Sequence, residues 1–177
     1  MLLARPFVFM RHGETALNQE HRLGGSTDSP LTPLGERQAR NAAAWLDHPW
    51  SHVATSTLRR AWRTAELVVP GQPASRYPGL NERDWGELER VPLSQQPPYL
   101  DTPPGGESWE AFQARVLASL NTLLLSHHRP LVIAHSGVFR VIRTQLLGRP
   151  DGPRLPNATP LLLQPGLLGW QIHRFMA

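Results

Sequence analysis

The chain has 177 residues, a formal net charge of +4 and no cysteine, which fits one domain over residues 1–177 and excludes disulfides, a thiol nucleophile and a Cys-ligated metal site. A basic composition also suits a nucleic-acid binder. Here, however, the net charge is modest, and the basic residues, all of them Arg, are scattered along the chain without forming a basic run. We therefore expect no nucleic-acid partner.

The first residues do not have the pattern of a signal peptide. Residues 1–4 are apolar or small, but Arg5 and Pro6 interrupt the run, which is too short for the apolar core of such a peptide. No apolar run approaches the roughly 20 residues of a membrane span. We therefore expect a cytoplasmic protein without a membrane partner.

Residues 7–10 are consecutive apolar residues and predict a short buried strand, which ends at Arg11-His12-Gly13. Open α/β sheets carry their chemistry at the carboxyl ends of their strands. A polar loop over residues 16–28 is expected next. Its adjacent Gly24 and Gly25 let a ligand approach the backbone closely.

Thr32 and Pro33 suit the N-cap and first position of a helix, which we expect to end before His48-Pro49. Its apolar face consists mostly of alanines, which allow close packing on a sheet. A second strand is predicted over residues 52–56.

A helix is predicted over residues 58–67, with Arg59, Arg60 and Arg63 in its first two turns. Positive charge at a helix N-terminus opposes the helix dipole. This placement therefore indicates a ligand more than a contribution to stability. A third short strand is predicted over residues 74–77.

The segment of residues 84–107 is polar and rich in proline and glycine, and predicts a short cap over a pocket. Ser108 suits the N-cap of a helix that we expect to run to about His127. A buried strand over residues 131–134 then leads to His135-Ser136-Gly137, followed by a helix over residues 138–147.

The tail predicts a hairpin of residues 159–163 and 166–173 around Gln164-Pro165-Gly166. Strands and helices alternate through most of the chain. This alternation predicts a three-layer α/β/α sandwich with a mostly parallel sheet.

Arg11-His12-Gly13-Glu14-Thr15 resembles the signature of the histidine phosphatase superfamily, whose fold is phosphoglycerate mutase-like. Other blocks follow in the family's order over nearly the whole chain, which is far more specific than the tripeptide alone. They are Asn18 and Arg22, residues 28–39, residues 56–65, residues 80–86, residues 105–108 and residues 135–137.

The resemblance implies phosphoryl transfer through a phosphohistidine, with His12 as the nucleophile. Arg11 and Arg60 would hold the phosphate, because guanidinium forks match its oxygens. Glu82 would protonate the leaving oxygen and then accept a proton from water, and a protonated His135 would stabilise the transition state. Further phosphate or substrate contacts are expected from Asn18, Gly24, Gly25, Arg83 and Ser136. No metal and no cofactor is expected.

Several alternatives remain. Asp84 and Glu87 share a loop with Glu82 and compete with it as the acid. The glycerate mutases of the family carry a basic insertion after the acid motif, whereas residues 91–101 contain no basic residue, which favours a phosphatase over a mutase. A non-catalytic protein that binds phosphorylated ligands would be expected to lack His12 or Glu82, and both are present.

The expected substrate is a small phosphorylated metabolite, such as a compound like α-ribazole phosphate or a sugar phosphate. A phosphoprotein is left open by the short cap. A homodimer is also left open, because Trp109, Trp170 and the Leu-rich tail suit a core as well as an interface.

Overall fold

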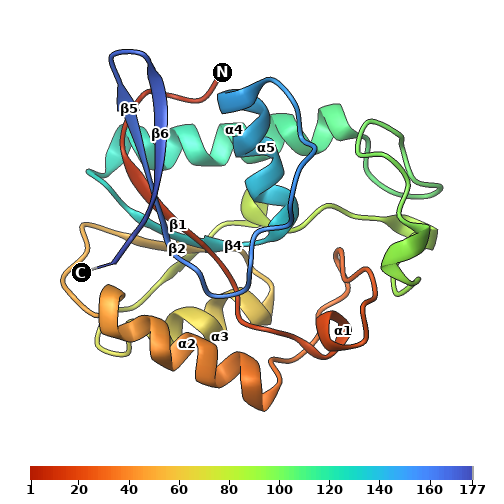
Figure 1. Cartoon of the computed structure of the whole chain (residues 1–177), viewed down its shortest axis with the longest axis horizontal. Helices are drawn as coiled ribbons and strands as arrows, with labels where there is room; N and C mark the ends of the chain where they lie inside the picture. Colours follow the sequence, from red (N-terminus) through yellow and green to blue (C-terminus); the bar gives the residue numbers. More distant parts are fainter. Residues whose placement is uncertain (177) are drawn as a thin grey trace.

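The computed structural model describes residues 1–176, and Figure 1 shows a central sheet between two helical layers. The strand order is β3-β2-β4-β1-β5-β6. Strands β1 to β4 pair in parallel, whereas β5 and β6 add an antiparallel hairpin at one edge. The predicted three-layer α/β/α sandwich with a mostly parallel sheet is confirmed. The strands are β1 (Phe7–Arg11), β2 (Val53–Thr55), β3 (Ser75–Arg76), β4 (Leu131–Ala134), β5 (Leu161–Gly166) and β6 (Gly169–Arg174).

Alternate residues of the buried strands supply the two halves of the core. Phe7 and Phe9 of β1 pack with the layer of α4 (Trp109–Ser126) and α5 (Ser136–Leu147). Val8 and Met10 pack with the layer of α2 (Pro33–Leu46) and α3 (Arg59–Val68). Because successive strand side chains point to opposite faces, an unbroken apolar run is what a strand covered on both faces requires.

Side-chain caps fix where two of the long helices begin. The Thr32 hydroxyl accepts a hydrogen bond from the Gly35 N–H at the start of α2, where Pro33 takes the first helical position. The Ser108 hydroxyl accepts from the Ala111 N–H at the start of α4. These contacts satisfy amide groups that have no partner within the helix. No helix within residues 1–176 is both long and apolar enough to cross a membrane.

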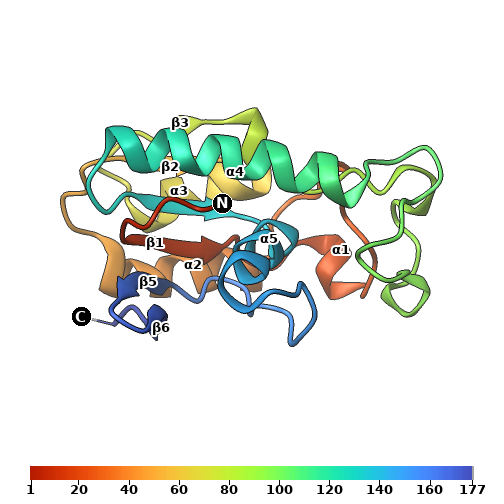
Figure 2. The same ribbon diagram turned by 90° about the horizontal axis from the view of Figure 1, so that it is seen from above.

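The cap segment, residues 84–107, has no strand or α-helix and contains the short 3₁₀ helices Gly86–Leu88 and Leu93–Gln95. A third 3₁₀ helix, Pro78–Leu80, precedes it. Figures 1 and 2 both show the cap at the end of the molecule where α1 (Ala16–Gln19) lies. The cap and the loop that follows β1 therefore meet beyond the same end of the sheet.

Three local predictions need correction. Residues 16–19 form the short helix α1 instead of a loop, because Thr15 and Asn18 make reciprocal capping contacts. Helix α5 begins at Ser136, directly after His135, and not at residue 138. The hairpin turns at Leu167-Leu168, with Gly166 opposite Gly169, so Pro165 lies inside β5. Pro165 is tolerated there because β5 pairs with β1 only as far as Leu163.

Candidate active site

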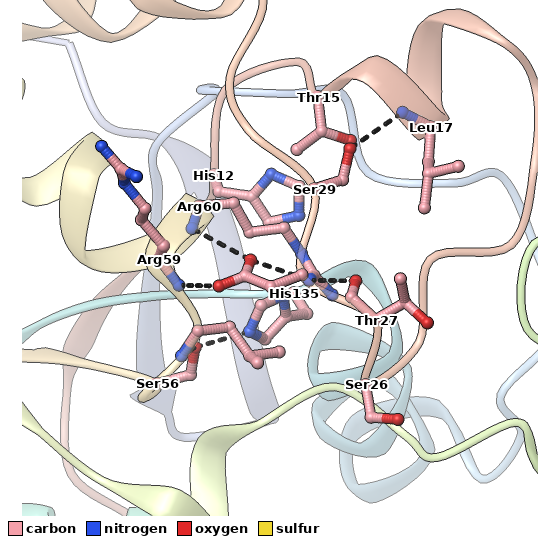
Figure 3. A network of polar contacts seen from close by, with 12 residues as sticks. His12, Thr15, Leu17, Ser26, Thr27, Ser29, Ser56, Arg59, Arg60 and His135 are labelled. Carbon is pink, nitrogen blue, oxygen red and sulfur yellow. Dashed lines mark hydrogen bonds and ion pairs between the residues drawn. The ribbon is translucent and has the colours of Figure 1, made fainter.

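The site is built at the carboxyl ends of the neighbouring parallel strands β1 and β4. Arg11, the last residue of β1, lies opposite Ala134, the last residue of β4. The residue after each strand is a histidine, so the register brings His12 and His135 together with ring centroids 5.2 Å apart (Figure 3). Two motifs separated by more than a hundred residues thus meet at one point.

The structure defines the protonation pattern of His12. Its Nδ1 lies 2.7 Å from the carbonyl oxygen of Gly13. A carbonyl oxygen only accepts, so Nδ1 carries the hydrogen and donates it. Burial, with Arg60 and Arg11 nearby, holds the pKa of His12 well below its usual value. The ring is therefore neutral at neutral pH, and its Nε2 carries a free lone pair.

Arg60 and Arg11 are buried cations beside His12. Arg60, 4 % exposed, donates from Nη2 to the Gly25 carbonyl at 2.6 Å and from Nη1 to the Thr27 carbonyl at 3.0 Å. Its Nη1 also lies 3.4 Å from a carboxylate oxygen of Asp28. These contacts fix the position of the guanidinium against the loop that contains Gly24 and Gly25, called the glycine loop below.

Arg11 has an unused donor. Its Nη1 donates to the Leu155 carbonyl at 2.8 Å, but its buried Nε has no partner in the part of the chain that the structure describes. Burial and the charge of Arg154 lower its pKa to about 10, so it remains charged at neutral pH. A buried charged donor without an acceptor is costly in a protein interior, which indicates an anionic ligand.

His135 is fully buried, and its Nε2 lies 2.6 Å from the hydroxyl of Ser56 (Figure 3). Its Nδ1 has no partner within the described residues. Burial and the nearby charge of Arg60 hold the pKa of His135 well below its usual value. In the ligand-free protein the ring is therefore neutral at neutral pH, and the expected protonated state depends on the negative charge of a bound phosphate.

Glu82 is placed at the site by the first turn of α5. One of its carboxylate oxygens accepts from the Gly137 N–H at 2.9 Å, and the other accepts from the Arg83 N–H at 2.8 Å. Glu82 is half-buried and lines the pocket, whereas Asp84 and Glu87 are exposed and do not line it. The geometry therefore favours Glu82 over the two competing carboxylates.

A pocket that is open to solvent lies above these groups. It brings together most of the predicted residues: Arg11, Asn18, Gly24, Gly25, Arg60, Glu82, Arg83 and Ser136. The two histidines lie behind this lining, with 4 % of His12 exposed. The arginines, and not the imidazoles, form the surface that a ligand meets first.

Asn18 presents its amide N–H₂ to the pocket. Its Oδ1 accepts from the Thr15 N–H at 3.1 Å and from the Asn157 side chain at 3.3 Å, which leaves Nδ2 as the group for a ligand. Asn157 also donates to the carbonyl of His12 at 3.0 Å. Sequence reasoning missed Asn157, because it lies in an aperiodic stretch with no signal beyond turn-forming residues.

Arg83 does not act as the expected substrate contact. It is 1 % exposed, and its donors go to the carbonyls of Glu107 at 3.0 Å, Tyr99 at 2.8 Å and Asp101 at 2.7 Å. Its guanidinium also stacks over the Trp85 ring, 4.6 Å from the centroid. Arg83 lines the pocket wall, but its hydrogen bonds hold the cap together.

The glycine loop is held by a carboxylate that the sequence did not single out. Glu89 accepts from the N–H groups of Ser26 at 3.1 Å and Thr27 at 2.8 Å. Gly25 has a φ of +56°, and a Cβ there would collide with Glu89, so this position needs glycine. No group of three or more His, Asp or Glu side chains within residues 1–176 is arranged to hold a metal ion.

Comparisons with known proteins agree with this geometry. The model of the histidine phosphatase superfamily (branch 1) matches residues 7–174. The uncharacterized phosphatase PhoE of Bacillus subtilis is 33% identical over 146 residues, which cover 78% of this chain and 76% of the relative. The probable phosphoglycerate mutase GpmB of Cronobacter sakazakii is 35% identical over 159 residues, which cover 80% of this chain and 74% of the relative.

Among solved structures, a putative alpha-ribazole-5'-P phosphatase from Escherichia coli superposes with a TM-score of 0.82 at 26% identity, covering 99% of this chain and 97% of that one. The family match, the identities and the paired histidines among arginines lead to one conclusion: the chain belongs to the histidine phosphatase superfamily, branch 1.

Proposed function

We propose that this protein is a metal-independent phosphomonoesterase that acts on a small phosphorylated molecule through a phosphohistidine at His12. One observation carries the proposal. The hydrogen bond from His12 Nδ1 to the Gly13 carbonyl leaves Nε2 unprotonated between two buried arginines, which is what attack on a phosphate dianion requires.

In the first half of the proposed reaction, Nε2 of His12 attacks phosphorus and the bond from phosphorus to the ester oxygen breaks. A protonated Glu82 gives its proton to that oxygen, and the alcohol leaves. Arg11 and Arg60 neutralise the charge on the non-bridging phosphate oxygens, and Asn18 adds a neutral donor.

In the second half, water attacks phosphorus, passes a proton to Glu82, and the nitrogen–phosphorus bond breaks with its electron pair returning to His12. Inorganic phosphate then leaves. A bound phosphate dianion would oppose the positive charges that lower the pKa of His135, so binding would favour a proton on that ring during the reaction.

The cap supports hydrolysis over mutase transfer. Residues 91–101 contain no basic residue, whereas the resemblance gives the glycerate mutases a basic insertion in this part of the chain. A mutase is nevertheless a second candidate, because the relative from Cronobacter sakazakii bears that name. A compound like α-ribazole phosphate, or a sugar phosphate, is the proposed kind of substrate, supported by the fold shared with the Escherichia coli structure.

The test is acid quench of the protein with a ³²P-labelled aryl phosphate in the presence of EDTA. We expect acid-labile label on His12, steady release of inorganic phosphate, and loss of both in His12→Ala. His173→Ala, which replaces an exposed histidine on β6, serves as the matched control and should retain both.

Absence of label and turnover in the wild-type protein, with EDTA or with added Mg²⁺, would show that the proposal is wrong. Chasing the labelled protein with 2-phosphoglycerate or 3-phosphoglycerate separates the two candidates. Transfer of label to the phosphoglycerate faster than to water would instead identify a mutase.

A further inference from the structure

The pocket carries more positive charge than one phosphate group requires. Its lining includes Arg11, Arg22, Arg60, Arg83 and Arg154, with Glu82 as the one acidic residue among the lining residues that the structure describes. Arg11 and Arg60 suffice for a phosphate dianion, and Arg83 is committed to the cap. Arg22 donates to the Arg90 carbonyl and lies 3.6 Å from Glu20.

Arg154 is the cation that these roles leave unexplained. It lies in the loop between α5 and β5, is exposed, and lines the pocket. Its one hydrogen bond among the described residues runs from Nη2 to the side-chain carbonyl of Gln96 in the cap, at 3.1 Å. It makes no ion pair within residues 1–176. Most of its N–H donors are therefore available to a ligand.

The charge of Arg154 acts on the same cavity as the phosphate site. After burial, Arg154 is the largest cause of the lowered pKa of Arg11. The two guanidinium groups thus repel each other across the pocket, and an anion between or beside them relieves this repulsion. Arg154 is exposed whereas Arg11 is buried, so an anionic group that contacts Arg154 lies nearer to solvent than a phosphate held by Arg11 and Arg60.

We propose that Arg154, held over the pocket mouth by Gln96, forms a subsite for a second anionic group of the substrate. This inference rests on the proposed phosphatase function and narrows its substrate class to phosphomonoesters whose alcohol carries a carboxylate or a second phosphate. It therefore favours a sugar phosphate with a second acidic group over a compound like α-ribazole phosphate. Half-buried Tyr99, together with Phe112, lines the same pocket, which suits an apolar body that joins two acidic ends.

The test measures binding of three non-hydrolysable ligands by calorimetry. They are 4-carboxybenzylphosphonate, its neutral isostere 4-carbamoylbenzylphosphonate, and 1,4-xylylenediphosphonate. We expect wild-type protein to bind at least one of the two doubly acidic ligands about tenfold more tightly than the isostere, the scale of one charge-assisted hydrogen bond. Which acidic ligand gains more identifies the second group as a carboxylate or a phosphate.

In Arg154→Gln this preference should fall to less than about twofold, because affinity for the acidic ligands falls more than affinity for the neutral isostere. Arg149→Gln removes an exposed arginine of the same loop that does not line the pocket, and should keep the preference. The preference should also weaken as salt is raised, because the subsite is open to solvent.

Three results would overturn the inference: equal affinity of the wild-type protein for charged and neutral ligands, no binding of any of them, or an unchanged preference in Arg154→Gln. An unchanged preference in Arg154→Gln would mean that Arg154 only donates its hydrogen bond to Gln96 and does not bind the ligand. None of these measurements requires turnover. A failed phosphohistidine experiment is therefore distinguishable from a failed subsite.

Discussion

At the scale of single residues, His12 obtains its properties from two kinds of neighbour. The Gly13 carbonyl orients the ring, and the buried arginines disfavour a proton on it. An imidazole in water would be partly protonated near its usual pKa and free to use either nitrogen. Here one nitrogen is occupied and the other stays available, which is the arrangement that a nucleophile needs.

The first prediction concerns how closely Gly137 approaches Glu82. A Cβ at Gly137 would collide with the Glu82 carboxylate, so Gly137→Ala should displace the proposed proton donor. We expect kcat to fall about ten- to hundredfold, since general acid–base catalysis contributes roughly 10²–10⁴-fold. Stability should change little, because the flexible end of Glu82 can move aside and Ala is about 1 kcal/mol better than Gly inside a helix.

Turnover of an aryl phosphate and thermal unfolding, measured on the same preparation, check whether kcat falls while stability is retained. Gly71→Ala is the matched control, because a Cβ at Gly71 meets no other atom within 4 Å. It should leave both quantities unchanged. Full activity in Gly137→Ala would argue that Glu82 is not the proton donor.

At the scale of elements, short sequence patterns are sufficient to predict most of the strands and helices. The apolar run before Arg11 predicted β1, and Thr32 and Ser108 predicted the starts of α2 and α4. These signals work because a cap or a run of buried residues acts within a few positions of the chain. The ordered motifs then allowed the main site residues to be named, and the structure brings them together.

The features that were missed depend on contacts that no local pattern encodes. Arg83 stands beside the acid motif like a ligand, yet its partners are carbonyls some 16 to 24 positions away. Asn157 reaches His12 across 145 positions. Pro165 looked like a turn residue, and its place in β5 is understandable only once the pairing with β1 is seen to stop at Leu163.

The second prediction of this section concerns the cap. Arg83→Met removes three hydrogen bonds to carbonyls and the stacking on Trp85. Losing these part-buried contacts of a buried side chain should lower the free energy of unfolding by about 3 kcal/mol. Arg83→Lys should not restore it, because an ammonium group cannot reproduce the planar fork.

Urea unfolding and hydrogen exchange of residues 84–107 measure this effect. Arg90→Gln, which changes an exposed residue of the same segment, is the control. If Arg83→Met kept its stability and its cap protection but raised KM, Arg83 would return to the role of a substrate contact.

At the scale of the whole molecule, the apolar core and the candidate active site occupy different parts of the sheet. The two core clusters lie on opposite faces of the sheet, whereas the buried arginines and histidines gather at the end of β1 and β4. A covered parallel sheet offers this end as the place where polar groups emerge from a rigid interior. Ionisable groups are thereby held in a poorly solvated region, which shifts their pKa values. The free energy of unfolding therefore depends on pH.

The last prediction follows from the sign of that dependence. His12 and His135 both have a pKa well below the usual value in the folded protein, whereas the unfolded chain takes up their protons near pH 6.5. Below that pH the unfolded state binds more protons, so the free energy of unfolding is highest above about pH 6.5 and decreases as the pH falls. Well below pH 6.5, each histidine that stays neutral in the folded protein adds about 1.4 kcal/mol per pH unit to this slope, and the pair adds about 2.7.

Urea unfolding between pH 5 and 7.5 in a buffer free of phosphate measures the slope. Replacing both residues by Asn should make it shallower, by about 2.7 kcal/mol per pH unit near pH 5 and by less as the pH rises past 6.5. His52, whose pKa is also lowered, contributes in the same direction and remains in the variant, so some slope should persist. Adding phosphate should flatten the wild-type slope, because an anion beside Arg11 and Arg60 makes a proton on the histidines less costly. An identical slope in the wild-type protein and the double variant would mean that neither ring is held neutral by its surroundings, and the proposed nucleophile would lose its physical basis.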